Sequence, residues 1–156
     1  MKYYIIAGEA SGDLHGANLI TSIKKMDQYA HIQCWGGDAM QAAGGHLVKH
    51  YRDLAFMGFI EVVSNLFTII KNIRFCKKDI TSFRPDVLIC IDYPGFNLRI
   101  AKWAKKEKIK VVYFIAPQVW AWKENRVPAM RASIDRLLCI LPFEKKYFKD
   151  RWNWEV

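Results

Sequence analysis

One carboxylate stands where a buried strand should end. Asp92 follows the uninterrupted apolar run 87–91, and Pro94 and Gly95 break the chain two residues later. An apolar run without alternation is typical of a strand covered on both faces, as in a parallel sheet. Ligands of open α/β sheets bind at the carboxyl ends of the strands, and partial burial there raises the pKa of a carboxyl group and suits it to act as a base. A helix cap or a turn is an equally good use of an aspartate here, so both interpretations stay open.

A second candidate is the segment Gly8-Glu9-Ala10-Ser11-Gly12-Asp13, which joins a first expected strand to a first expected helix. Small residues let main-chain amides approach a ligand, and a helix N-terminus favours anions. The segment matches neither the G-x-G-x-x-G nor the P-loop pattern, and its two carboxylates would repel a phosphate. If it is functional, it suits sugar hydroxyls better. On local grounds a plain strand-to-helix turn with Ser11 as N-cap is favoured.

An aromatic loop forms the third candidate. The segment Pro117-Gln118-Val119-Trp120-Ala121-Trp122-Lys123-Glu124-Asn125-Arg126 follows an expected strand at 111–115 and should reach the same sheet edge as Asp92. Exposed tryptophans tend to pack on something, and sugars or acyl chains would serve. Lys123 and Arg126 could hold a phosphate. Equally, the two tryptophans could cover the core of an incomplete domain.

A long helix is expected over residues 59–82. Its apolar face is wider than a surface helix needs and is followed by Lys71, Arg74, Lys77 and Lys78. An apolar face beside a basic cluster indicates a helix that lies on a membrane surface, and the apolar segment 56–59 strengthens that interpretation. From the pattern alone, a core helix with a solvated basic end is favoured.

Two histidines, His46 and His50, are four residues apart but lack a third ligand, and Gly44 and Gly45 argue against a helix that would bring them together. We therefore predict no metal site.

Around these candidates, strands alternate with helices. The expected strands are 3–7, 31–35, 86–91, 110–115 and 136–141, and the expected helices are 13–26, 39–43, 59–82, 96–107, 124–134 and one from 142. This alternation predicts an α/β fold with a doubly wound parallel sheet. The last residues, 152–156, look like the start of another strand, so we expect a longer protein.

Composition limits the classes of function. The chain has 156 residues, about one domain, and 52% hydrophobic residues exclude disorder. The net charge of +9 favours anionic partners, and 14% aromatic residues suit a membrane surface or single-stranded nucleic acid.

The four cysteines form no CxxC pair and are expected to be reduced, buried thiols of a cytoplasmic protein. The first apolar run is too short for a signal peptide, and no run approaches the ~20 residues of a transmembrane helix, so membrane contact would be peripheral.

Five segments, in order, make the chain resemble the lipid-A-disaccharide synthase family of bacterial glycosyltransferases. They are Gly8-Glu9-Ala10-Ser11-Gly12-Asp13, Met57-Gly58-Phe59-Ile60-Glu61-Val62, Ile91-Asp92-Tyr93-Pro94-Gly95-Phe96-Asn97, Pro117-Gln118-Val119-Trp120-Ala121-Trp122-Lys123 with Arg126, and Leu141-Pro142-Phe143-Glu144-Lys145. The resemblance implies a Rossmann-like N-terminal half of a GT-B-type glycosyltransferase. Residues 1–156 would form a single acceptor-side domain, the UDP-donor domain would lie beyond Val156, and the isolated chain is expected to be inactive.

The resemblance also implies a reaction. Inverting transfer of 2,3-diacylglucosamine from UDP-2,3-diacylglucosamine to the 6-hydroxyl of 2,3-diacylglucosamine 1-phosphate would give a β-1,6 disaccharide 1-phosphate and UDP, with no cofactor or metal. Asp92 would be the base. The substrate-binding residues would be Asn97, Glu9, Ser11 and Asp13 on sugar hydroxyls, Lys123 and Arg126 on the acceptor phosphate, and Trp120, Trp122, Met57 and Gly58 on sugar or acyl chains, with Gly8, Gly12 and Gln118 completing the site.

The implied location is the cytoplasmic face of the inner membrane, reached through the 59–78 part of the long helix, with self-association as a further expectation. A rival interpretation is a non-catalytic basic module for nucleic acid or acidic lipid. Its basic residues are dispersed and carry no nucleic-acid motif, so we expect no nucleic-acid partner. Another UDP-sugar transferase of the same fold is the second alternative.

Overall fold

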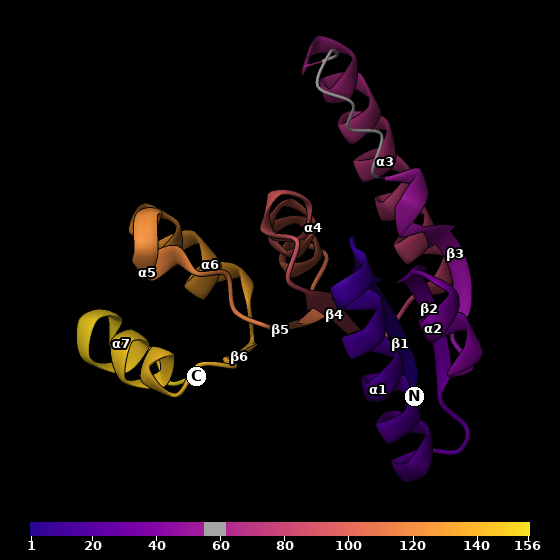
Figure 1. Ribbon diagram of the computed structural model, residues 1–156, viewed down its shortest axis with the longest axis horizontal. Helices are drawn as coiled ribbons and strands as arrows, with labels where there is room; N and C mark the ends of the chain where they lie inside the picture. The colour runs from indigo at the N-terminus through magenta and orange to yellow at the C-terminus, as the bar shows by residue number, and fades with distance from the viewer. Residues whose placement is uncertain (55–61) are drawn as a thin grey trace.

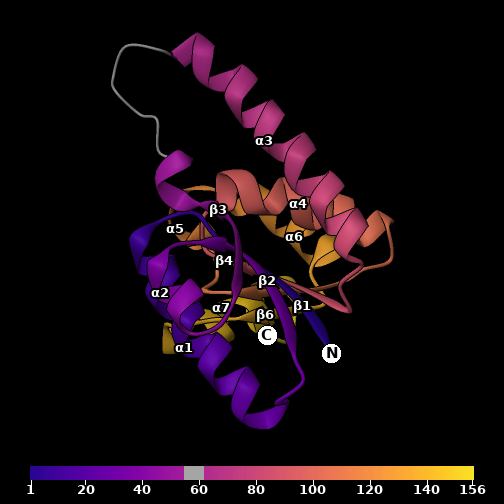
Figure 2. The ribbon, with the colours of Figure 1, turned by 90° about the vertical axis from the view of Figure 1, so that its right-hand side faces the viewer.

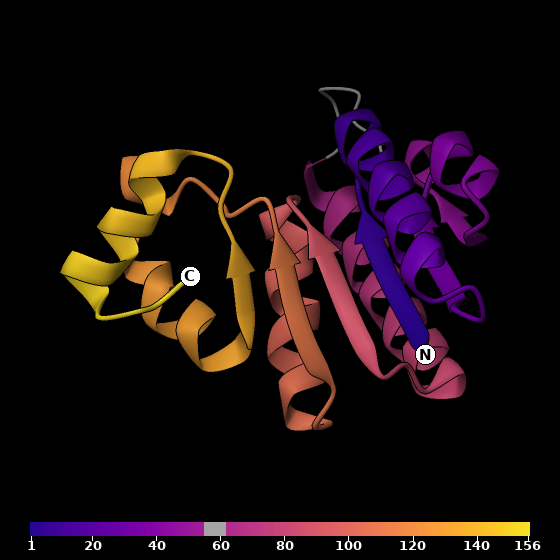
Figure 3. The same ribbon diagram turned by 90° about the horizontal axis from the view of Figure 1, so that it is seen from below.

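Six parallel strands form one sheet in the computed structural model, which describes residues 1–54 and 62–156, with side chains of the second range described from residue 67 on. The strands are β1 (Lys2–Ala7), β2 (His31–Gly36), β3 (His46–His50), β4 (Val87–Ile91), β5 (Lys110–Phe114) and β6 (Arg136–Leu138). Their order across the sheet is β3-β2-β1-β4-β5-β6 (Figures 1 and 3). This is the order of a doubly wound Rossmann-like sheet, which confirms the predicted fold class.

Helices cover both faces of the sheet (Figure 1). The helices are α1 (Ala10–Met26), α2 (Asp38–Ala42), α3 (Val62–Phe83), α4 (Pro94–Lys106), α5 (Val119–Trp122), α6 (Val127–Ser133) and α7 (Pro142–Trp152), with single 3₁₀ turns η1 (Tyr51–Asp53) and η2 (Glu124–Arg126). Helices α1 and α2 lie on one face, and α3, α4 and α6 lie on the other. The N-terminal part of α3 extends away from the sheet (Figure 2).

Alternating side chains divide the core between the two faces. On β1, Tyr4 and Ile6 belong to the cluster that α3, α4 and α6 cover, and Ile5 packs with Ile20 of α1 on the opposite face. Strand β4 is buried along its whole length because both its faces are covered. This explains why its sequence is an unbroken apolar run.

Two local expectations were wrong. No strand was predicted at His46–His50, but β3 pairs there with β2 as the outer strand. Its two histidines, four residues apart along a strand rather than a helix, are separated by about 13 Å of rise, too far to share one metal. The chain end is not the start of a strand either, because α7 continues to Trp152 and Trp154 then packs edge-to-face on Phe148 with ring centroids 5.4 Å apart.

The remaining elements agree with the predicted ones apart from shifts at their ends, and α5 lies within the predicted aromatic loop. The expected start of the long helix at residue 59 and the segment 56–59 lie outside the described residues. Cys34, Cys76 and Cys90 are buried, as predicted, whereas Cys139 is half-buried. Within residues 1–54 and 62–156, no helix has the length and apolar character needed to span a membrane.

Candidate active site

Asp92 lies at the point where the strand order of the sheet reverses. Strands β1 and β4 are neighbours, and Ala7 pairs with Ile91 at their carboxyl ends. The loop from Gly8 and the turn at Asp92 therefore leave the sheet side by side, at the position where doubly wound folds usually bind ligands. In this chain, however, the Tyr93 ring lies directly on Gly8, since a Cβ built there would be 2.3 Å from Tyr93 Cδ1. The ring closes the crevice between β1 and β4, and the open space lies on the β5 side.

The turn after β4 has an unusual backbone. Asp92 and Tyr93 have φ angles of +43° and +48°, in the left-handed region that asparagine and aspartate tolerate and bulky residues avoid. Three hydrogen bonds hold the Asp92 main chain: its N–H donates to the Phe114 carbonyl at 3.1 Å, and its carbonyl accepts from Tyr113 Oη at 2.6 Å and Asn97 Nδ2 at 2.9 Å. Neighbouring elements thus fix the turn that presents the Asp92 carboxylate.

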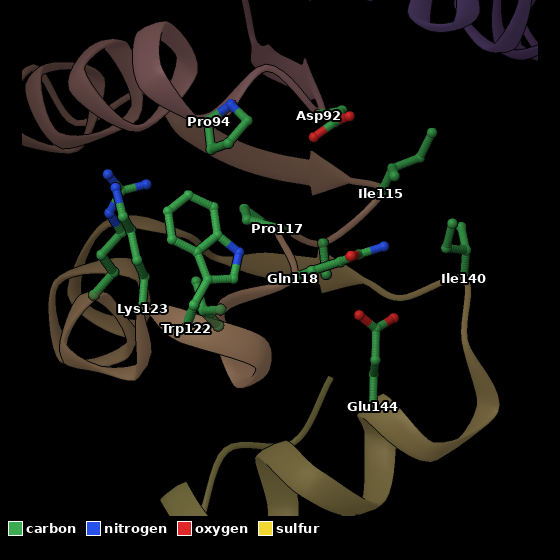
Figure 4. A pocket seen from close by; sticks show the side chains of 12 residues that line it. Asp92, Pro94, Ile115, Pro117, Gln118, Trp122, Lys123, Ile140 and Glu144 are labelled. Carbon is green, nitrogen blue, oxygen red and sulfur yellow. The ribbon is translucent and has the colours of Figure 1, made fainter.

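A cavity of about 330 Å³ opens beside this carboxylate (Figure 4). It is lined by Asp92, Pro94, Ile115, Ala116, Pro117, Gln118, Val119, Trp122, Lys123, Arg126, Ile140 and Glu144. These residues come from the segments that follow β4, β5 and β6, so the cavity lies at the carboxyl ends of three strands. The sequence prediction that Asp92 shares a sheet edge with the aromatic loop is confirmed.

The charges around the cavity have opposite signs. Burial, and then the nearby Glu9 carboxylate, raise the pKa of Asp92, while a hydrogen bond from the Tyr93 N–H works in the other direction. Two cations, Lys123 and Arg126, line the cavity, and neither forms an ion pair within the described parts of the chain. A carboxylate with a raised pKa can accept a proton, and unpaired cations can bind an anion.

The two tryptophans of the aromatic loop lie in different places. Trp122 is 73% exposed and lines the cavity, with Lys123 Nζ 4.3 Å from the centre of its ring. Trp120 does not line the cavity: its Nε1 donates to Glu144 Oε1 at 3.1 Å, and its ring packs edge-to-face on Phe143. The indole of Trp120 is therefore turned toward α7, away from the cavity that Trp122 lines.

Glu144 is a cavity residue that the sequence analysis did not single out. It is fully buried, and its Oε2 accepts from the Leu141 N–H at 3.1 Å while Oε1 holds Trp120. A signal existed in the sequence, because proline at the first helical position with glutamate two residues later marks a capped helix start. What could not be read from it is that this helix start faces Asp92 across the cavity (Figure 4).

Two other predicted sugar contacts have buried side chains that bind main-chain groups. Asp13 is buried in α1, and its carboxylate accepts hydrogen bonds from the main-chain N–H groups of Gly37, Ala39 and Met40 at 2.7–3.1 Å. Asn97 is fully buried and donates to main-chain carbonyls, among them that of Asp92. Both side chains hold the backbone of neighbouring turns, and neither lines the cavity.

The rest of the segment 8–13 does not line the cavity. Ser11 lies inside α1 and is not the N-cap, a position that Glu9 occupies. Its Oγ donates to Glu9 Oε1 at 2.6 Å. Gly12 is buried against Ala7, where a Cβ would lie 3.1 Å from Ala7 Cβ, and this lets α1 approach β1 closely. Glu9 is exposed and acts on Asp92 through its charge. Met57 and Gly58 lie outside the described residues.

The fold defines the class of protein. A UDP-GlcNAc 2-epimerase from Neisseria meningitidis, solved with UDP-GlcNAc, is similar over 85% of this chain and 39% of that chain, with a TM-score of 0.58 and 14% identity. A putative UDP-N-acetylglucosamine 2-epimerase from Listeria monocytogenes is similar over 97% of this chain and 41% of that chain, with a TM-score of 0.69 and 10% identity. At such low identity the likeness shows the fold alone, which is the Rossmann-like half of a GT-B-like architecture.

The sequence then gives the family. The lipid-A-disaccharide synthetase family model matches residues 3–153, and the chain belongs to this family. It is 42% identical to the lipid-A-disaccharide synthase of Geobacter metallireducens over 95% of this chain and 38% of the relative. Identity to lipid-A-disaccharide synthase 1 of Legionella pneumophila strain Paris is 40% over 96% of this chain and 39% of the relative. The chain thus spans about two-fifths of the length of these relatives.

Proposed function

We propose that this chain is the acceptor-side domain of a glycosyltransferase of lipid A biosynthesis. The complete enzyme would transfer 2,3-diacylglucosamine from its UDP conjugate to the 6-hydroxyl of 2,3-diacylglucosamine 1-phosphate. The observation that carries the proposal is the half-buried Asp92 beside a cavity with two unpaired cations, in a chain of this family. The domain that binds most of the UDP donor would lie beyond Val156.

In the proposed step, Asp92 accepts the proton of the acceptor hydroxyl as its oxygen attacks the anomeric carbon of the donor. A new carbon–oxygen bond forms while the bond to the UDP phosphate oxygen breaks, and UDP leaves with the electron pair. The α-linked donor becomes a β-linked product, so a single displacement accounts for the inversion without a covalent enzyme intermediate. General-base catalysis of this kind contributes about 10²–10⁴-fold in rate.

The other cavity residues would bind the acceptor. Lys123 and Arg126 would hold its phosphate, and their lack of an ion-pair partner in the described chain supports this role. Trp122 and Gln118 would contact the sugar. Glu9, outside the cavity lining, would orient a hydroxyl and, through its charge, keep the pKa of Asp92 raised.

The proposed location is the cytoplasmic face of the inner membrane. Helix α3 exposes Phe67, Ile70 and Phe75 beside the exposed cations Lys71 and Arg74. Apolar and basic side chains on one projecting helix suit an anionic membrane surface. Peripheral binding through α3 would bring the cavity to substrates that reside in the bilayer.

The decisive experiment replaces the proposed base in the complete enzyme. Asp92→Asn should leave folding intact and lower turnover at least a hundredfold, because the amide cannot accept the proton. Asp150→Asn, an exposed aspartate of α7, is the matched control and should leave turnover unchanged. Near-normal turnover of Asp92→Asn would remove Asp92 from the mechanism.

Binding of the acceptor can be tested on this chain by tryptophan fluorescence. A saturable response to 2,3-diacylglucosamine 1-phosphate that Trp122→Phe diminishes would support an acceptor site in the Asp92 cavity. An equal response to a lysophospholipid would contradict recognition of the sugar. UDP alone should produce no response if the donor binds elsewhere in the complete enzyme.

A further inference from the structure

A second cavity lies between α4 and α6, next to the Asp92 cavity. This α4–α6 cavity has a volume of about 250 Å³ and is lined by Pro94, Gly95, Leu98, Arg99, Lys102, Arg126, Ala129, Met130 and Ser133. On α4, residues 95, 98, 99 and 102 follow the spacing of a single helix face, and α6 packs against α4. Pro94 and Arg126 line both cavities, so the two spaces share a wall.

The lining of the α4–α6 cavity is apolar inside and positively charged at its edge. Leu98 is half-buried and Met130 is only 1% exposed, whereas Arg99 and Lys102 are exposed. No carboxylate lines the cavity, and its three cations form no ion pair within the described residues. The Ser133 hydroxyl donates to the Ala129 carbonyl at 2.7 Å, so its hydrogen is not free for an anionic ligand. A molecule with an aliphatic part and an anionic group would complement both features.

We propose that the α4–α6 cavity receives an acyl chain of the acceptor lipid whose phosphate binds at Arg126. The inference rests on the proposed function, since it assigns a subsite to that acceptor. The chemistry of the acceptor matches the arrangement of the two cavities. Its phosphate is on the first ring carbon and an acyl group is on the adjacent second carbon, whereas the reacting 6-hydroxyl lies across the ring. With the phosphate at the shared Arg126 wall, the chain enters the α4–α6 cavity and the hydroxyl faces Asp92.

The Met130 methyl group reports directly on this cavity. We would label the methionine methyl carbons of the full 156-residue chain with ¹³C and titrate dodecyl phosphate below its micelle concentration. The Met130 signal should shift saturably, while Met26, 92% exposed at the end of α1, and Met40, buried on the opposite face of the sheet, should not move. Inorganic phosphate should leave Met130 unchanged, and neutral dodecyl maltoside should bind at least tenfold more weakly.

Gly95 offers a variant that fills the cavity without disturbing the fold. A Cβ built on Gly95 meets nothing within 4 Å, so Gly95→Leu places its side chain in open space and should weaken dodecyl phosphate binding at least tenfold. Lys102→Gln should weaken it about threefold or more, whereas Lys106→Gln, a cation of α4 outside the cavity lining, should not. Urea unfolding of each variant checks that the fold is retained. The inference would be overturned if dodecyl phosphate did not shift the Met130 signal, or if Gly95→Leu bound dodecyl phosphate as tightly as the unaltered chain does.

The acceptor itself separates this inference from the proposed function. The inference requires 2,3-diacylglucosamine 1-phosphate to shift Met130 more strongly than lysophosphatidic acid does. An equal shift with both lipids would overturn it, because the sugar ring would then contribute nothing to placing the chain in the cavity. If Met130 does not respond but Asp92→Asn abolishes turnover of the complete enzyme, the inference fails and the proposed function stands. If Met130 responds to the sugar lipid but the complete enzyme transfers no sugar, the lipid subsite stands and the proposed function fails.

Discussion

The ring of Tyr93 lies so close to Gly8 that a Cβ on Gly8 would be only 2.3 Å from Tyr93 Cδ1. Two consequences follow from this contact. It packs the ring of Tyr93, whose φ angle of +48° is one that bulky residues rarely adopt. It also fills the crevice between the first loop and the Asp92 turn, so the cavity opens toward the loops after β5 and β6 instead.

Gly8→Ala should therefore destabilise the protein by about 1–3 kcal/mol, the usual cost of inserting a methyl group into packed space. The new methyl must displace the Tyr93 ring and with it the Asp92 turn. The matched control is Gly95→Ala, whose Cβ meets nothing within 4 Å, and which should stabilise α4 by up to about 1 kcal/mol. Urea unfolding measures both changes, and equal stabilities of the two variants would contradict the packing argument.

Asp13 should be a stability residue. Its carboxylate accepts three main-chain hydrogen bonds at the start of α2, and removing the acceptor leaves buried N–H groups without partners. We expect Asp13→Ala to lower the free energy of unfolding by about 3 kcal/mol, at the upper end for hydrogen bonds to a charged group. Ser11→Ala, two residues away and exposed, should change it by less than about 0.5 kcal/mol. A stable Asp13→Ala variant that loses acceptor binding would instead support the substrate contact predicted from the sequence.

The pKa of Asp92 should depend on Glu9. Burial and the Glu9 charge both raise it above the ordinary value of 3.8, so the folded protein keeps this proton to a higher pH than the unfolded chain does. Stability contributed by Asp92 is therefore present at low pH and lost as the pH rises through the raised pKa. Glu9→Gln should move the Asp92 titration to lower pH, measured by ¹³C NMR of the carboxyl carbon.

The control for this titration is Glu107→Gln, at the far end of α4. It should leave the Asp92 midpoint where it is in the unaltered chain. In the complete enzyme, the acidic limb of the pH–rate profile should move in the same direction as the titration after Glu9→Gln, if Asp92 is the base. An acidic limb that stays in place while the titration shifts would mean that another group limits the rate.

Helix α3 should carry membrane affinity. Phe67 is 74% exposed and Ile70 is also exposed, so Phe67→Ser with Ile70→Ser should keep the fold. The double variant should partition at least fivefold less onto vesicles that contain phosphatidylglycerol. The reason is the loss of apolar contact area with the membrane. The control pair on α1, Leu14→Ser with Met26→Ser, removes exposed apolar side chains from the other face of the sheet and should leave partition unchanged. Equal losses from both pairs would mean that α3 has no special role.

Local patterns in the sequence were sufficient for the fold class and the location of Asp92. The unbroken apolar run of β4 requires two covered faces, and alternating strands and helices lead to a parallel sheet whose carboxyl ends share one edge. Such patterns depend only on residues that are close together in the sequence, so the sequence alone reveals them. The short strand β3 escaped prediction because its two apolar residues show no clear period and its place depends on pairing with β2.

Only the tertiary structure decided which polar residues face the cavity. Asp13 and Asn97 have the residue types of sugar contacts, but in the fold they lie buried against main-chain groups, Asp13 against the turn at Gly37 and Asn97 against the turn at Asp92, and buried polar groups must form hydrogen bonds. Glu144 reaches the cavity because α7 folds back toward Asp92 from residues 52 positions further along the chain. The contact between Tyr93 and Gly8 joins residues 85 positions apart. Such contacts depend on packing between strands and helices far apart in sequence, which residue type and spacing alone do not specify.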